Sequence, residues 1–160
     1  MSKIMSKSGL AIVLSGLKGF ESPKVRQEQY PTDSEVAASV LWSACLLEDI
    51  EGKSIVDLGC GTGILGIGAL LLGAKSVTFI DSDKNALETS KNSISKLKSE
   101  GYRIGKAEFK CQDIEGIRKA KIEVVIQNPP FGIKKRHADI YFLEKALEII
   151  GKNKGVLLYM

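Results

Sequence analysis

The sequence predicts an α/β fold, in which helices cover both faces of a doubly wound, mainly parallel sheet. Two observations predict it. From residue 54 onward, short apolar segments rich in β-branched residues alternate with longer amphipathic segments. The chain has 160 residues, of which 44% are hydrophobic and 26% charged, as expected for one domain with a single core. We therefore expect a single domain over residues 1–160.

The N-terminal 50 residues precede this alternation and predict two helices. Over about 8–19, Leu10 and Leu14 fall on one face together with Val13 and Leu17. A polar, irregular stretch follows at 20–35. A second helix is expected over about 34–48, with four residues on one side: Val36, Val40, Ala44 and Leu47.

Residues 51–160 supply the sheet and its connecting helices. Strands are predicted at 54–58, 76–81, 107–111, 124–127 and 155–160, and helices at 64–72, 83–98 and 140–150. Right-handed crossovers in the usual order place the first strand at the centre, near the strand that ends at Asn128. Ligands of such sheets bind outside the carboxyl ends of the strands.

The charge is unevenly distributed along the chain. The formal net charge is +4, but residues 103–136 hold nine Lys or Arg against four Asp or Glu, which is a local +5. Such a basic half favours a polyanionic partner, although lysines that merely solvate a surface give the same pattern.

The cysteines and the hydropathy indicate the setting. Cys45, Cys60 and Cys111 are far apart and form no C-x-x-C pair, so neither a disulfide framework nor a metal site is indicated. A reducing, cytoplasmic location is the simplest expectation. No run of about 18 apolar residues predicts a transmembrane helix.

A glycine-rich loop, DLGCGTG, follows the first strand and opens a helix. Gly59, Gly61 and Gly63 allow a tight turn on which a ligand can lie. Asp81 closes the second strand, where its carboxylate can accept hydrogen bonds from both hydroxyls of a ribose. Residues 61–66 also match the dinucleotide pattern G-x-G-x-x-G, and a plain tight connection is a further alternative.

Two aspartates favour S-adenosylmethionine over a dinucleotide. Asp57 precedes the glycines, where it can orient the loop and interact with the ligand's ammonium group. Asp113 follows the third strand and can accept a hydrogen bond from an adenine amino group. The loop closely resembles the first motif of class I S-adenosylmethionine-dependent methyltransferases, which implies their Rossmann-like fold.

The fourth strand ends in an unusual sequence, Asn128-Pro129-Pro130-Phe131. The Asn128 side-chain carbonyl and the Pro129 backbone carbonyl could both accept from an exocyclic amine and turn its lone pair toward the methyl donor. The prolines fix the backbone, and Phe131 would stack on a base swung out of its own stack. A turn with a core-filling Phe is the alternative.

These residues are similar to the NPPF/Y motif of amino-methyltransferases, which modify adenine N6, cytosine N4 or a glutamine side chain of a release factor. Residues 27–32 contain EQYPT, which could also be a plain helix entry. With DLGCGTG and NPPFG, this segment resembles the methyltransferase-like protein 5 family of small-subunit ribosomal RNA adenine-N6 methyltransferases. The resemblance implies that Gln29 and Thr32 close over the cofactor.

The candidate site residues follow from the motifs and the resemblance. The cofactor-binding candidates are Gln29, Thr32, Asp57, Gly59, Gly61, Thr62, Gly63, Ile64, Asp81, Asp113 and Ile114. The catalytic candidates are Asn128, Pro129, Pro130 and Phe131. Lys134, Lys135 and Arg136 could hold RNA phosphates, or could simply form a solvated turn.

The resemblance also implies more than the chain contains. The family's fold continues past the fifth strand with a further helix and two strands, whereas this sequence stops at Tyr159-Met160, so we expect a truncated sheet. A small zinc-binding activator subunit of the Trm112 type is an implied partner. Protein glutamine N5-methylation and a non-catalytic cofactor-binding or assembly module remain alternative functions, and a dinucleotide oxidoreductase comes last.

Overall fold

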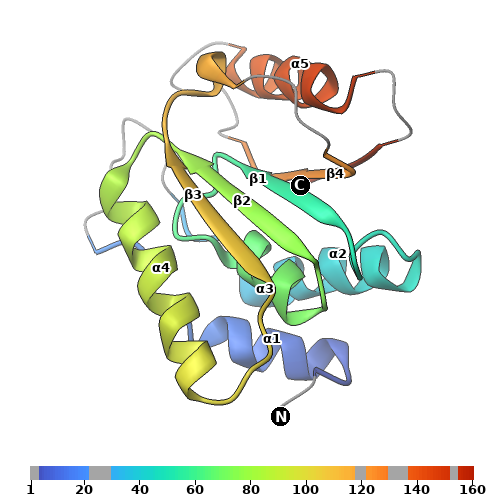
Figure 1. The fold of residues 1–160 in the computed structure, drawn as a ribbon, viewed down its shortest axis with the longest axis vertical. Coiled ribbons are helices and arrows are strands. Elements are labelled where there is room, and N and C mark those ends of the chain that lie inside the picture. Colours follow the sequence, from blue (N-terminus) through green and yellow to red (C-terminus); the bar gives the residue numbers. More distant parts are fainter. Residues whose placement is uncertain (1–3, 22–29, 118–121, 130–136, 152–154) are drawn as a thin grey trace.

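The described part of the chain forms five strands with helices on both sides (Figure 1). The computed structural model describes residues 4–21, 30–117, 122–129, 137–151 and 155–160. In chain order, the elements are α1 (Lys7–Ser15), α2 (Ser34–Leu46), β1 (Ser54–Leu58), α3 (Ile64–Leu71), β2 (Ser76–Asp81), α4 (Lys84–Ser99), β3 (Lys106–Cys111), η2 (Ile114–Gly116), β4 (Val124–Gln127), α5 (Ala138–Ile150) and β5 (Val156–Tyr159).

The sheet has the predicted topology. Its strand order is β3-β2-β1-β4-β5, and every neighbouring pair is parallel. β1 lies in the middle, where Asp57 pairs with Phe79 of β2 on one side and Ile126 of β4 on the other. The predicted central position of the first strand beside the Asn128 strand is therefore confirmed. Consequently the carboxyl ends of β1, β2 and β4 share one edge of the molecule.

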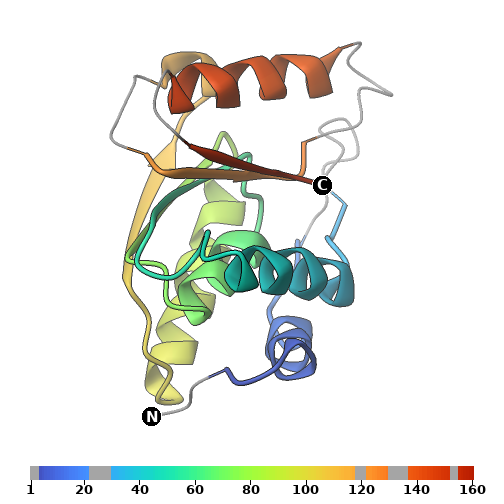
Figure 2. The same cartoon turned by 90° about the vertical axis from the view of Figure 1, so that its right-hand side faces the viewer.

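The two faces of the sheet are covered unequally (Figure 2). On one face, α3 and α4 contact the strands and α1 and α2 pack against α3; on the other, α5 contacts β4 and β5. The larger core contains Phe79 and Leu70, whereas the smaller core beneath α5 contains Leu58 and Val125. Helices on both faces confirm the doubly wound α/β class.

The buried face of α2 differs from the expected one. Val36 is 50% exposed and Leu47 73% exposed, whereas α2 buries Ala44, as expected, together with Ala37, Ala38 and Leu41. Small alanine side chains let α2 approach α3 closely, and a Cβ at Gly68 of α3 would collide with Leu41. Close packing through small residues therefore overrides the preference for burying the larger valines.

The helix boundaries follow from local capping. Asp33 caps α2 by accepting hydrogen bonds from the backbone N–H groups of Glu35 and Val36, and Asp83 caps α4 in the same way. α1 ends four residues earlier than expected, at Ser15, with Gly16 as its C-cap. Among the described residues, no helix combines the length and the hydropathy needed to cross a membrane.

Candidate active site

The glycine-rich loop joins β1 to α3 in a conformation that its glycines make possible. Gly59, Gly61 and Gly63 have φ values of 68°, 55° and 85°, a region that favours glycine. Inside the loop, the N–H of Gly63 donates to the carbonyl of Cys60 over 2.9 Å. The Cys60 N–H in turn donates to the carbonyl of Ile80 over 3.0 Å, which ties the loop to the end of β2.

Asp57 lies beneath this loop and connects β1 to α3. Its Oδ2 accepts a hydrogen bond from the Gly66 N–H in the first turn of α3, over 2.8 Å. Only 1% of the residue is exposed, and burial raises the pKa of its carboxyl to about 7. This geometry gives Asp57 a role in orienting the loop and α3; contact with a ligand's ammonium group stays a prediction.

Asp81 holds the loop from the end of β2. Its Oδ2 accepts from the Gly61 N–H over 2.7 Å, and its Oδ1 accepts from the Asp83 N–H over 2.8 Å. Burial raises the pKa of the carboxyl, and these backbone hydrogen bonds oppose the increase. Because Asp81 is only half-buried, its remaining lone pairs can accept from ribose hydroxyls at the loop.

Ser90 is a site residue that the sequence analysis missed. It belongs to α4, is fully buried, and its Oγ lies 3.3 Å from the carbonyl of Gly61 and 3.2 Å from that of Ala86. Its hydroxyl therefore supports the glycine loop from behind. A serine on the apolar face of an amphipathic helix, beside Leu87 and Ile94, was the available signal.

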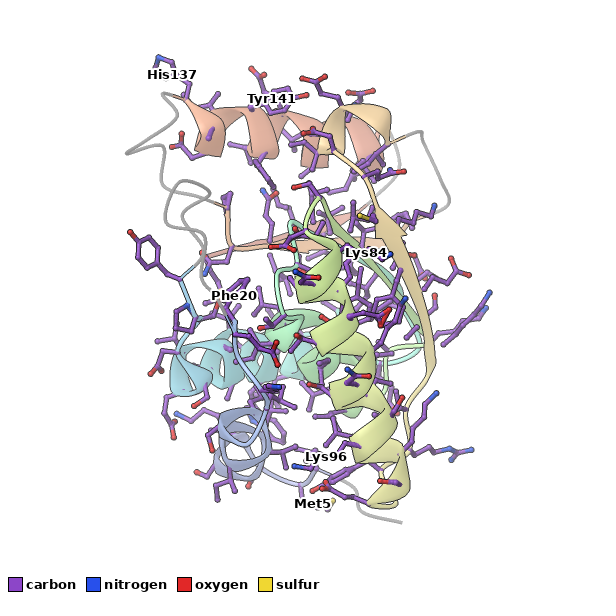
Figure 3. The ribbon with its side chains drawn as sticks, turned by 90° about the vertical axis from the view of Figure 1, so that its left-hand side faces the viewer. Met5, Phe20, Lys84, Lys96, His137 and Tyr141 are labelled. Carbon is purple, nitrogen blue, oxygen red and sulfur yellow. The ribbon has the colours of Figure 1, made fainter. Side chains whose placement is uncertain are left out.

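Two aromatic rings that were also missed lie against the loop. A Cβ at Gly61 would lie 2.9 Å from the ring of Phe20, on the segment that follows α1 (Figure 3). A Cβ at Gly59 would lie 2.7 Å from the ring of Phe142 on α5. Both rings therefore pack directly on glycine backbone, and any larger residue in the loop would displace them.

Asp113 and Ile114 follow the end of β3. Asp113 is exposed and caps η2, since its Oδ1 accepts from the Glu115 N–H over 3.1 Å. Ile114 is buried in the core beneath α5. The hydrogen bond predicted from adenine to Asp113 and the cofactor contact predicted for Ile114 stay predictions. Thr62 and Ile64, at the start of α3, are half-buried.

Asn128 stands directly after β4 and meets a residue from the N-terminal part of the chain. Its Nδ2 donates a hydrogen bond to Oγ1 of Thr32 over 3.1 Å, and both groups are partly buried. Pro129 is buried. The structure thus brings together one residue each from EQYPT and NPPF. Of the other candidates, six lie outside the described residues: Gln29, Pro130, Phe131, Lys134, Lys135 and Arg136.

Gln127, the last residue of β4, is unusual within the core. It is 0% exposed, and neither Nε2 nor Oε1 has a hydrogen-bond partner in the described part of the chain. It pairs with Tyr159 of β5 across the strands. A buried amide without hydrogen-bond partners destabilises the folded state, so such groups are rare in native proteins. This one directly precedes the catalytic candidate Asn128.

The hydrogen bonds within the loop favour a cofactor without phosphates. A dinucleotide pyrophosphate needs free N–H groups and positive potential at the helix N-terminus. Here the N–H groups of Gly61, Gly63 and Gly66 are bonded within the protein, and two of them bind carboxylates. A ligand with ribose hydroxyls and no phosphate fits this arrangement, as S-adenosylmethionine does.

Comparison with known proteins identifies the family. The sequence model of the family described as "Methyltransferase small domain" matches residues 34–158. MJ0284 of Methanocaldococcus jannaschii is 39% identical over 91% of this chain and 68% of its own length. The rRNA N(6)-adenosine-methyltransferase METTL5 of Danio rerio is 33% identical over 91% of this chain and 70% of its own length.

A solved structure agrees with these matches. The crystal structure of PH1948 from Pyrococcus horikoshii matches with a TM-score of 0.81 and 46% sequence identity. The match covers 89% of this chain and 69% of the PH1948 chain. The chain thus spans about two thirds of the length of its relatives. It belongs to the methyltransferase small domain family and, within it, to the METTL5 family of class I methyltransferases whose methyl donor is S-adenosylmethionine.

Proposed function

We propose that this methyltransferase transfers a methyl group to N6 of an adenine in RNA, with small-subunit ribosomal RNA as its substrate. The observation that carries the proposal is the position of Asn128. It follows β4 at the same edge of the sheet as the glycine loop and Asp81, and its amide is oriented by a hydrogen bond. An amide and a proline carbonyl at this place suit a planar amine.

The chemistry assigned to these residues is positioning. The lone pair of an exocyclic amine is delocalised into its ring, so the amine is a weak nucleophile. Oδ1 of Asn128 and the Pro129 carbonyl would each accept one N–H and hold the nitrogen with its lone pair toward the methyl donor. S-Adenosylmethionine supplies an electrophilic methyl group. The N–C bond forms as the C–S bond breaks, and the amine then loses a proton to water.

The relatives support this substrate. The names of the related proteins from Drosophila melanogaster, Danio rerio and Caenorhabditis elegans all describe rRNA N(6)-adenosine-methyltransferases, at 36%, 33% and 29% identity. The positive charge of residues 103–136 is consistent with a phosphate-rich partner. In this proposal Lys134, Lys135 and Arg136 contact phosphates next to the flipped base, while Phe131 stacks on it.

Two further parts of the proposal concern the setting. A Trm112-type activator subunit would pair along a sheet edge, and β3 is an edge strand of the described sheet. The protein would work in the reducing cytoplasm, which is consistent with three cysteines that form no disulfide in the described part of the chain.

Product analysis tests the proposal and separates it from its alternatives. The chain would be incubated with methyl-labelled S-adenosylmethionine and either unmodified small-subunit rRNA or ribosomal protein extract, with and without an added Trm112-type subunit. Label in N6-methyladenosine, after digestion of the RNA to nucleosides, supports the proposal. Label in N5-methylglutamine, after enzymatic digestion of the protein to amino acids, would establish the protein-directed alternative. Cofactor binding without any labelled product, even with a full-length partner subunit and RNA present, would favour the non-catalytic module.

A further inference from the structure

A hydrogen bond joins Thr32, in the N-terminal part of the chain, to Asn128 directly after β4. The amide nitrogen of Asn128 and the hydroxyl oxygen of Thr32 lie 3.1 Å apart, although 96 residues separate them in the sequence. The resemblance assigns Thr32 to the cofactor, but in the structure its side chain contacts the residue that is expected to hold the substrate amine.

Thr32 is well placed to fix another side chain because its own backbone is anchored. The next residue, Asp33, caps α2 through hydrogen bonds of 2.9 and 3.0 Å from the N–H groups of Glu35 and Val36. α2 in turn is buried through Ala37, Ala38 and Leu41. Thr32 therefore lies directly before the N-cap of a helix that is part of the larger core.

The orientation of an asparagine amide decides which of its two ends faces a ligand. Its nitrogen only donates and its oxygen only accepts, and a rotation of the amide exchanges the two. An amine substrate needs the oxygen, since two donors facing one another form no hydrogen bond. Because Thr32 accepts from Nδ2, this hydrogen bond leaves Oδ1 as the end for the amine.

We propose that Thr32 is a positioning residue for methyl transfer, which holds the Asn128 amide in place with Oδ1 free for the amine. The proposal rests on the proposed amine-methylating function and deepens it. It differs from a cofactor contact in what it predicts: loss of the hydroxyl lowers the rate of methyl transfer and leaves the affinity for S-adenosylmethionine nearly unchanged.

The first experiment detects the hydrogen bond without any turnover. Protein labelled with ¹⁵N-asparagine gives side-chain amide signals, and Asn128→Ala identifies that of Asn128. In Thr32→Val this signal should shift and exchange faster with water, while Thr32→Ser, which keeps the hydroxyl, should resemble the wild type. Thr89→Val is the matched control, because the Thr89 hydroxyl donates a hydrogen bond within α4, to the Asn85 carbonyl. An unchanged Asn128 signal in Thr32→Val refutes the contact.

The second experiment measures single-turnover methyl transfer and cofactor affinity for the same variants. Loss of one orienting hydrogen bond predicts a rate about tenfold lower for Thr32→Val at saturating S-adenosylmethionine. Its dissociation constant should change less than about twofold, and Thr32→Ser should recover most of the rate. A weakened affinity with an unchanged rate would refute positioning and assign Thr32 to the cofactor.

The two experiments separate this inference from the function on which it rests. Failure of the wild type to methylate RNA would refute the proposed substrate, whereas the amide signal still decides whether Thr32 orients Asn128. Wild-type transfer that persists at full rate in Thr32→Val would refute the inference alone.

Discussion

Replacing Asp57 with asparagine should change how the stability of the protein depends on pH. The carboxyl is 1% exposed, and burial raises its pKa from 3.8 to about 7. The folded state therefore binds a proton more tightly than the unfolded state does. Because a raised carboxyl pKa favours the protonated folded form, the stability linked to Asp57 falls as the pH rises from about 4 to about 7.

The size of this effect follows from the two pKa values. The difference between 3.8 and about 7 is roughly three units, and each unit corresponds to about 1.4 kcal/mol. Ionised Asp57 should thus cost about 4 kcal/mol of unfolding free energy above pH 7. Asparagine stays neutral and keeps an oxygen that can accept from the Gly66 N–H, so Asp57→Asn should lack this loss.

Urea denaturation at pH 5 and pH 8.5 measures the effect, with the exposed-residue variant Glu51→Gln as a control. The quantity of interest is the free energy of unfolding of Asp57→Asn minus that of the wild type. It should rise by about 3 kcal/mol between the two pH values, because the folded pKa of about 7 lies two units above pH 5. The corresponding difference for Glu51→Gln should stay near zero. A difference for Asp57→Asn that does not change with pH would refute the assignment of a buried, proton-binding carboxyl.

Three further substitutions test other parts of the account. Gln127→Met removes a buried amide without partners among the described residues, so the free energy of unfolding should rise by about 1–3 kcal/mol in urea denaturation; a loss of stability would contradict this. Ser90→Ala removes the hydroxyl that supports Gly61, so calorimetry should find about fivefold weaker S-adenosylmethionine binding, whereas the neighbouring control Ser93→Ala should bind as the wild type does. Gly66→Ala would place a Cβ against the Phe79 ring and 2.9 Å from Oδ2 of Asp57, so it should destabilise the protein by about 1–3 kcal/mol; wild-type stability in urea would show that this packing is looser.

The sheet could be predicted from the sequence because its signals are local and redundant. The strands at 54–58, 76–81 and 124–127 have the bounds that their apolar runs predict. Their parallel order then follows from the helix between each pair and from the handedness of such crossovers. These signals need no knowledge of distant side chains.

The packing of α2 could not be predicted in the same way. Hydrophobic periodicity favours the larger Val36 and Leu47, yet the helix turns its alanines and Leu41 toward α3. The deciding partner is Gly68, which leaves room for Leu41 and lies 27 residues farther along the chain. Periodicity describes one helix, whereas the choice between two similar faces depends on the surface that receives it.

The candidate site shows the same division. Asp57, Asp81 and the glycines were found because each stands at the end of a predicted strand, where ligands of parallel sheets bind. Ser90 and Phe142 were missed because they act through tertiary contacts from helices. The hydrogen bond between Thr32 and Asn128 likewise joins two motifs whose proximity no local pattern reveals.

The most direct test of the central claim separates cofactor binding from methyl transfer in Asn128→Ala. Calorimetry would give the affinity for S-adenosylmethionine, and labelled transfer to small-subunit rRNA would give the rate, with Asn92→Ala on the exposed face of α4 as the matched control. We predict near-wild-type binding of S-adenosylmethionine and a rate of methyl transfer at least about a hundredfold lower. Other enzymes lose about this much rate when one hydrogen-bonding group that stabilises the transition state is removed. Transfer by Asn128→Ala at the rate of Asn92→Ala would contradict this prediction.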